Sequence, residues 1–116
     1  MKQKPHPLPY YAVIFTSVRT SGDNGYSKMA DRMMELAQKQ DGFISVDSAR
    51  EHIGITVSYW KDLDSIKKWK ENIEHKEAQK KGKSLWYKNY NIKIAKIENE
   101  YSFETTSNQQ PVTSNQ

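Results

Sequence analysis

The 116-residue sequence contains no cysteine, which excludes disulfide bonds, thiolate metal sites and a cysteine nucleophile. No apolar run approaches the ~20 residues that a membrane-spanning helix requires. The N-terminal sequence MKQKPHPLPYY starts with a positive charge but has prolines where a signal peptide needs an apolar helix. We therefore expect a cytoplasmic protein without a membrane partner.

Aliphatic residues are scarce at both ends of the chain. Residues 1–9 contain three of the four prolines, which predicts an extended N-terminal segment. Residues 104–116 contain one aliphatic residue, Val112, and so cannot bury enough apolar surface to offset their ordering entropy. We expect a disordered C-terminal tail there, and a single folded domain over residues 10–103.

Several common catalytic patterns are also missing. The sequence has no glycine-rich phosphate loop, no Ser/His/Asp set and no close pair of carboxylates. Its three histidines, His6, His52 and His75, are too scattered to indicate a metal site. The sequence therefore predicts neither a resident metal nor a nucleotide cofactor.

The net charge is +4, and much of it comes from lysines in residues 67–83. A basic helix face is one way to bind nucleic acid. Asp64–Lys68 and Glu77–Lys81, however, are acid–base pairs four residues apart with the acid first, which favours a solvated helix face. We expect no nucleic-acid partner.

Hydrophobic periodicity predicts four strands and two helices. Strands are expected where β-branched and aromatic residues alternate or cluster, and helices where apolar residues recur every three or four positions. The expected strands span residues 10–18, 43–51, 53–60 and 91–103, and the expected helices span residues 26–40 and 62–82.

Further details follow from local signals. Ser21, Asp23 or Asn24 is expected to cap the first helix, and Asp62 or Asp64 the second. The buried stripe of the second helix is expected to contain Leu63, Ile66, Trp69 and Ile73, followed by Ala78. One more turn is expected at residues 85–87, and the last strand is expected to include Tyr101 and Phe103.

The order βαββαβ predicts an α+β, ferredoxin-like fold. Right-handed crossovers place both helices on one face of a four-stranded antiparallel sheet. The other face then carries apolar side chains from the first strand, and from the third and fourth strands as well. Because a monomer rarely exposes so large an apolar patch, we expect a homodimer through this sheet face.

Residues 53–90 concentrate the aromatic side chains, including all three tryptophans. The most distinctive pieces are SYW at Ser58–Trp60, W-x5-H from Trp69 to His75, and WY at Trp86–Tyr87. With these motifs, residues 10–103 resemble the antibiotic biosynthesis monooxygenase (ABM) family, in particular its small stand-alone bacterial members. The resemblance implies a dimeric α/β barrel with a ligand between the sheet and the helices of one protomer.

The resemblance also implies an activity. Family members include monooxygenases that need no cofactor, quinol oxidases and haem-degrading enzymes. It implies a cofactor-independent monooxygenase or quinol oxidase acting on a small aromatic or quinol-like molecule. Haem degradation fits poorly, because the expected iron ligand ten residues after Trp69 is Gln79 and residues 10–18 contain no asparagine. The alternative is a non-catalytic ligand-binding or stress-associated barrel, since no matched catalytic set is present.

The candidate catalytic residues are His75, as general base or hydrogen-bond donor at the pocket mouth, and Trp69. His75 would otherwise be a surface histidine, and Trp69 would otherwise pack in the core. Arg50 either holds an anionic oxygen or pairs with an acid such as Glu51. The aromatic candidates either surround a ligand or pack the last turn against the sheet. The candidate substrate-binding residues are Phe15, Arg50, Ser58, Trp60, Trp86 and Tyr87.

Overall fold

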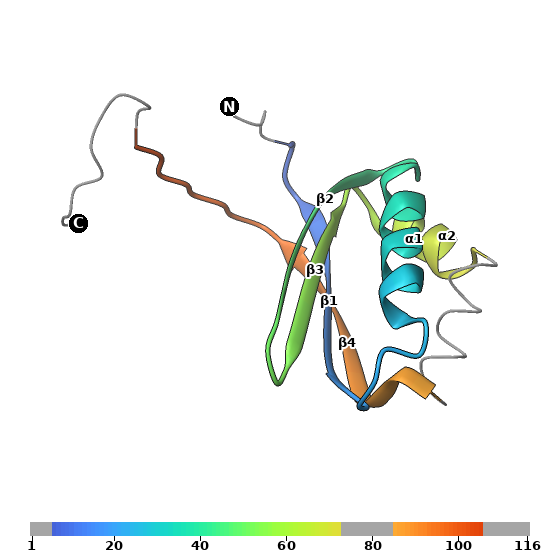
Figure 1. Cartoon of the computed structure of the whole chain (residues 1–116). Coiled ribbons are helices and arrows are strands. Elements are labelled where there is room, and N and C mark those ends of the chain that lie inside the picture. The colour runs from blue at the N-terminus through green and yellow to red at the C-terminus, as the bar shows by residue number, and fades with distance from the viewer. Residues whose placement is uncertain (1–5, 73–84, 106–116) are drawn as a thin grey trace.

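The computed structural model describes residues 6–72 and 85–105. Within these ranges the elements follow the predicted order βαββαβ (Figure 1). They are β1 (Tyr10–Arg19), α1 (Tyr26–Gln38), β2 (Phe43–Arg50), β3 (Gly54–Trp60), α2 (Leu63–Lys70) and β4 (Tyr87–Ile97).

The four strands form one antiparallel sheet in the order β2-β3-β1-β4. The two helices lie on the same side of this sheet (Figure 1). The α+β fold with a four-stranded antiparallel sheet is therefore confirmed. The prediction that the second strand lies at an edge is also confirmed, as is the central place of the first strand.

Strand alternation divides the side chains of β1 between the two faces. Val13 and Phe15 point toward the helices and line a cavity there. Ala12 and Ile14 therefore point to the opposite face. On the helix side, the buried core consists of Ala37, Trp60, Ile66 and Trp69.

The start of α1 is stabilised by Asp23, one of the three predicted capping residues. Its carboxylate accepts hydrogen bonds from the backbone N–H groups of Gly25 and Ser27 and from the Ser27 hydroxyl. These bonds, led by the one from the hydroxyl, lower the pKa of Asp23. The residue that directly precedes the helix is Gly25, whose φ of 85° is accessible to glycine without steric cost.

The second helix begins at the predicted cap, Asp62, whose side chain accepts from the Ser65 N–H at 2.8 Å and the Ser65 hydroxyl at 2.7 Å. Ile66 and Trp69 are buried, as the predicted stripe requires. Leu63 is not, with 52% of its surface exposed. Helical side chains lean toward the helix N-terminus, so a side chain at the first position projects past the end of the helix. Ile73, Ala78 and the predicted helix end at residue 82 lie outside the described residues.

The last strand differs most from its prediction. It begins at Tyr87, inside the expected extra turn, and it ends at Ile97 rather than Phe103. Ile97 is paired with Tyr10, the first residue of β1, so β4 ends where its antiparallel neighbour begins. Beyond it, Tyr101 and Phe103 are 93% and 87% exposed, and this segment extends away from the domain (Figure 1).

The sheet face away from the helices carries apolar side chains from three strands. Ile14 is paired with Val57, and Ala12 lies between Tyr59 and Ala95. Ile55, on the same face, is 46% exposed. The predicted homodimer through this face stays a prediction. None of the helices in the described ranges is long and apolar enough to cross a membrane.

Candidate functional site

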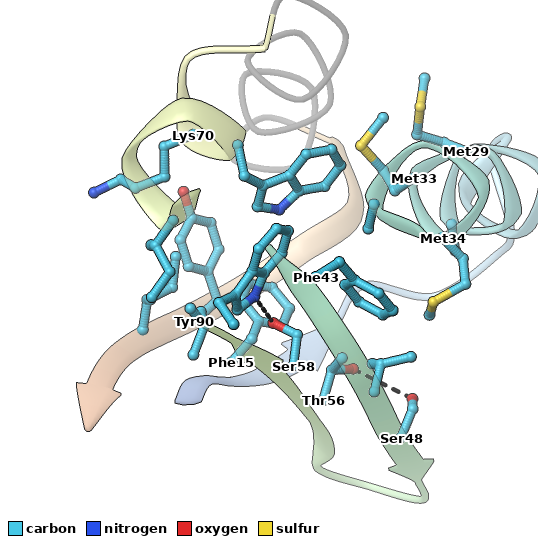
Figure 2. A pocket seen from close by; sticks show the side chains of 18 of the residues that line it. Phe15, Met29, Met33, Met34, Phe43, Ser48, Thr56, Ser58, Lys70 and Tyr90 are labelled. Atoms are coloured by element: carbon cyan, nitrogen blue, oxygen red, sulfur yellow. Dashed lines mark hydrogen bonds between the residues drawn. The ribbon is translucent and has the colours of Figure 1, made fainter. Parts of the chain in front are cut away.

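A cavity of about 270 Å³ lies between the sheet and the two helices. Figure 2 shows Met33 and Phe43 on its α1 side, with Tyr90 and Lys70 across from them. From the strands, the lining residues are Val13, Phe15, Phe43, Val46, Ser48, Thr56, Ser58, Trp60, Tyr87, Tyr90, Ile92 and Ile94. The other lining residues are Tyr26, Met29, Ala30, Met33, Met34, Ala37, Ile66, Trp69, Lys70 and Trp86.

One end of the cavity is closed by packed indole rings. The Trp60 and Trp69 rings stack with their centroids 5.9 Å apart, and Phe43 meets Trp60 edge-on at 5.4 Å. Trp60 is completely buried and Trp69 is 9% exposed. Trp69 thus packs in the core and also forms a cavity wall, so the two interpretations of this residue are compatible.

The hydroxyl of Ser58 is the polar group held by this wall. Its oxygen accepts a hydrogen bond from the Trp60 indole N–H at 2.9 Å (Figure 2). A hydroxyl has one proton to donate and two lone pairs, so Ser58 can still donate its proton. A neighbouring pair, Ser48 and Thr56, is joined hydroxyl to hydroxyl at 3.2 Å. Ser58 is therefore a potential hydrogen-bond donor in a wall that also contains the paired hydroxyls of Ser48 and Thr56.

The opposite end of the cavity is a cluster of phenol rings and Trp86. The Tyr87 ring centroid lies 5.5 Å from that of Phe15, 5.6 Å from Tyr90 and 5.8 Å from Tyr26. Burial raises the pKa of the Tyr87 phenol, and the neighbouring Tyr26 phenol raises it further, so Tyr87 stays protonated.

Trp86 fastens this end to the loop before α1. Its indole N–H donates to the Asn24 carbonyl at 2.9 Å, and its ring meets Tyr26 edge-on. Arg19 also connects this end of the cavity to β1. Its side chain donates to the Trp86 carbonyl at 3.3 Å, and its guanidinium lies 3.7 Å from the centre of the Tyr26 ring. Trp86 therefore shapes the site through both packing and hydrogen bonding.

Arg50 does not pair with Glu51, and its other expected role, holding an anionic oxygen, stays a prediction. Its guanidinium crosses Gly54 and donates to the Ser17 hydroxyl at 2.5 Å and to the Ser17 carbonyl at 3.4 Å. A side chain at Gly54 would collide with it. Among the described residues, no carboxylate forms an ion pair with Arg50. It lies beside the cavity rather than in the lining, close enough to oppose the rise in the Tyr87 pKa.

The structure thus brings most of the candidate residues to one place. Phe15, Ser58, Trp60, Trp69, Trp86 and Tyr87 line the cavity, and Arg50 stands at its margin. His75 lies outside the described residues, so its proposed role is untested. Sequence reasoning missed the cavity wall from α1, formed by residues such as Met29, Met33 and Met34. The apolar stripe of that helix was the available signal, but a stripe looks the same whether it packs a core or lines a pocket.

The described lining contains one fully charged side chain, that of Lys70, and no Asp, Glu or His. Its electrostatic character is therefore apolar and weakly positive. Within residues 6–72 and 85–105, no group of three or more His, Cys, Asp or Glu side chains is arranged to hold a metal ion.

Comparisons with known proteins agree with this architecture. The family model described as antibiotic biosynthesis monooxygenase matches residues 9–81. The uncharacterized protein YqjZ of Bacillus subtilis is 44% identical over 110 residues, covering 93% of this chain and 96% of YqjZ.

Solved structures show the same fold at low sequence identity. Rv0793 of Mycobacterium tuberculosis superposes with a TM-score of 0.70 at 13% identity, covering 81% of this chain and 99% of Rv0793. A conserved protein from Methanosarcina mazei superposes with a TM-score of 0.69 at 17% identity, covering 77% of this chain and 93% of that protein. SnoaB, a cofactor-independent oxygenase of Streptomyces nogalater, superposes with a TM-score of 0.60 at 11% identity, covering 87% of this chain and 98% of SnoaB.

The family model covers more than half of the chain, and YqjZ resembles it over nearly the whole length. On these grounds the chain belongs to the antibiotic biosynthesis monooxygenase family.

Proposed function

We propose that this protein is a cofactor-independent monooxygenase or quinol oxidase acting on a small aromatic or quinol-like molecule. The observation that carries the proposal is the aromatic-walled cavity between sheet and helices, with the oriented Ser58 hydroxyl in its wall. A cavity of 150 Å³ holds a benzene ring, so this one has room for about two fused rings. Membership of a family with a cofactor-independent oxygenase among its structural relatives supports the reaction type.

The chemistry requires the substrate to supply the electrons. A phenol that loses its proton becomes an electron-rich anion that can react with dioxygen. In a monooxygenation, one oxygen atom enters the ring to give a quinone and the other leaves as water. In a quinol oxidation, the quinol loses two electrons and two protons, and dioxygen becomes hydrogen peroxide. In both cases the protein's task is to hold the substrate and stabilise its anion.

Ser58 is the described residue placed for that task. Because its oxygen accepts from Trp60, its proton is directed to other acceptors, and an anionic substrate oxygen in the cavity is one. A hydrogen bond to a charged group is worth about 1.5–3 kcal/mol. Trp69 and Phe15 are expected to hold the ring of the substrate between aromatic surfaces. His75 remains the proposed general base.

Oxygen uptake with a panel of hydroquinones and naphthols in metal-free buffer tests the reaction. We expect turnover above the buffer rate with at least one compound, and quinone formation in step with oxygen consumption. Ser58→Ala should lower kcat/KM about 10-fold. Ser45→Ala, the same chemical change on the neighbouring strand at a position outside the cavity lining, is the matched control. Absence of turnover across the panel would refute the enzymatic proposal.

Ligand binding without catalysis is the second candidate. It is favoured by the absence of any carboxylate or histidine, the commonest general bases, among the described lining residues. Saturable binding of aromatic compounds, without oxygen uptake and with no effect of His75→Ala, would support this candidate over the first.

We also propose that the protein is a homodimer. The sheet face opposite the helices presents Ile14, Ile55 and Val57, and the segment after β4 presents two exposed aromatic rings. Sedimentation at micromolar concentration should show a dimer. Ile55→Asp should convert it to a monomer, whereas Leu63→Asp, an equally exposed aliphatic position on α2, should not. A folded wild-type monomer at these concentrations would refute the dimer.

A further inference from the structure

The sulfur atoms of the described chain are gathered in one place. The sequence has no cysteine and four methionines, of which Met29, Met33 and Met34 all lie on α1 and line the cavity. Figure 2 shows these three side chains on the same side of the cavity. The fourth, Met1, lies outside the described residues. Within residues 6–72 and 85–105, chemistry at sulfur is therefore confined to one wall of the candidate site.

Packing alone does not explain this methionine wall, which consists of Met29, Met33 and Met34. Methionine commonly fills irregular gaps in buried cores. None of these three residues belongs to the buried core described above, however, and each of them is half-buried. Their thioethers are therefore within reach of a molecule as small as hydrogen peroxide, both from solvent and from the cavity.

The reaction open to a thioether is oxidation to the sulfoxide. The sulfur lone pair attacks one peroxide oxygen, the O–O bond breaks as the S–O bond forms, and the other oxygen leaves as water. Sulfur is oxidised by two electrons, and peroxide is reduced by two. The product is a polar side chain that accepts hydrogen bonds, in place of a flexible apolar one.

An oxidised wall should bind aromatic molecules less tightly. Two donors of the cavity, the indole N–H groups of Trp60 and Trp86, are already engaged with the Ser58 hydroxyl and the Asn24 carbonyl. A hydrocarbon ring that lies against a sulfoxide supplies no donor and displaces the water that would. Burying a polar group in this way costs free energy. Oxidation therefore weakens ligand binding without a change in the rest of the site.

We propose that Met29, Met33 and Met34 form an oxidation site, at which hydrogen peroxide converts the methionine wall to sulfoxides and lowers the affinity of the cavity for aromatic ligands. The inference rests on the proposed function for the use of the cavity as a ligand site, and it adds regulation of that site. If the reaction is a quinol oxidation, peroxide is released beside the methionine wall. The product of one turnover then acts against the next, and reduction of the sulfoxides restores the site.

Peroxide treatment of the full-length protein tests the inference. Peptide mass mapping should locate added oxygen on the three wall methionines, and saturating 2-naphthylmethanol, a neutral aromatic probe, should slow its addition there but not at Met1. The comparison with Met1 corrects for peroxide that the probe itself consumes. Isothermal titration calorimetry should show about tenfold weaker binding of 2-naphthylmethanol after treatment, with an unchanged far-ultraviolet circular dichroism spectrum.

Three results would overturn the inference. One is equal protection of all four methionines by the probe. Another is an unchanged affinity after full oxidation of the wall. The third is loss of the circular dichroism spectrum together with the affinity, because general unfolding would then explain the effect.

Methionine-to-leucine variants separate the chemistry of the wall from other oxidative damage. Leucine keeps the apolar volume but has no sulfur to oxidise. The triple variant Met29→Leu, Met33→Leu, Met34→Leu should lose no affinity on treatment, relative to its own untreated value. Single variants should each lose part of the response, and they replace the triple variant if that variant does not fold. A triple variant as sensitive to peroxide as the wild type would place the damage elsewhere.

A thioether outside the cavity provides the matched control. Leu63 lies on α2, is 52% exposed and is not part of the described lining. Leu63→Met in the triple-leucine background should be oxidised by peroxide while the affinity for 2-naphthylmethanol stays constant. Treatment of the oxidised wild-type protein with methionine sulfoxide reductases should recover its affinity.

The outcome is separable from that of the proposed reaction, because the peroxide is added and not generated. A protein that consumes no oxygen with any quinol but loses aromatic binding on oxidation retains this inference and loses the oxidase. A protein that oxidises quinols and binds the probe equally before and after treatment retains the reaction and loses this inference. Failure of the untreated protein to bind 2-naphthylmethanol would also overturn it.

Discussion

Replacing Gly54 by alanine should destabilise the protein although glycine is usually a poor strand residue. The added methyl group would occupy the space of the Arg50 guanidinium, which crosses this position to reach Ser17. Gly54 has a φ outside the left-handed region, so its backbone conformation is open to alanine. The expected damage therefore comes from the displaced arginine and not from the strand.

The magnitude follows from two opposing effects. Displacing Arg50 removes its hydrogen bonds to Ser17, whose hydroxyl is then buried without this donor. Hydrogen bonds to charged groups are worth about 1.5–3 kcal/mol, and the exposure of Arg50 reduces this to about 1–2 kcal/mol. Replacing glycine by alanine recovers about 0.4–1 kcal/mol by restricting the unfolded chain. The net loss should be about 1 kcal/mol, or about 4–8 °C in Tm for a domain of this size.

Urea unfolding followed by tryptophan fluorescence measures the change. In the wild-type background, Gly54→Ala should lower the midpoint with an unchanged m value. In an Arg50→Ala background the same substitution should become stabilising, because no guanidinium remains to be displaced. This reversal of sign is specific to the proposed contact. Equal destabilisation in both backgrounds would refute the reasoning and place the collision elsewhere.

Three further predictions concern stability. Ile66→Ala should lower the free energy of unfolding by about 2–5 kcal/mol, because Ile66 is 3% exposed in the core, whereas Leu63→Ala should lower it by less than about 1 kcal/mol. Denaturant titration compares the two variants, and similar losses would contradict the difference in burial. Hydrogen bonds from Ser65 in the first turn of α2 lower the pKa of Asp62, so the stability contributed by the ionised Asp62 is present above the unfolded pKa and is lost as the pH falls. Asp62→Ala should therefore lower the Tm more at pH 6 than at pH 3. An equal loss of Tm at both pH values would contradict this role of Asp62. The hydrogen bond to Glu100 raises the pKa of Tyr10 to about 12, so the stability contributed by this bond is complete below pH 10 and is lost between pH 10 and 12. Tyr10→Phe should therefore reduce the loss of Tm between pH 10 and 12. An unchanged dependence of Tm on pH would contradict the Tyr10–Glu100 pairing.

Some features of the site were readable from single residues. The strand pattern placed Ser58 and Trp60 on one face of their strand, because side chains alternate along a strand. Trp69 followed from the three- and four-residue spacing of its helix. These predictions depend only on periodicity, which local sequence contains in full.

Other features depend on partners far apart in the chain. The end of β4 is set by its pairing with Tyr10, and the sequence NEYSF after Ile97 alternates as well as any strand. The place of Arg50 is set by a missing side chain at Gly54 and a hydroxyl at Ser17, contributed by two other strands. No local pattern records that these three residues meet.

The sequence by itself determined the order of the elements, the antiparallel sheet with one helix-covered face, and the family, because each of these depends on periodicity or on short motifs. Only the tertiary structure decided which aromatic rings close the cavity, that the Ser58 hydroxyl is oriented by an indole, and that a guanidinium stands beside a pair of phenols. The physical reason is that a site is defined by distances of a few ångströms between side chains that are tens of residues apart. The packing of the whole chain sets those distances.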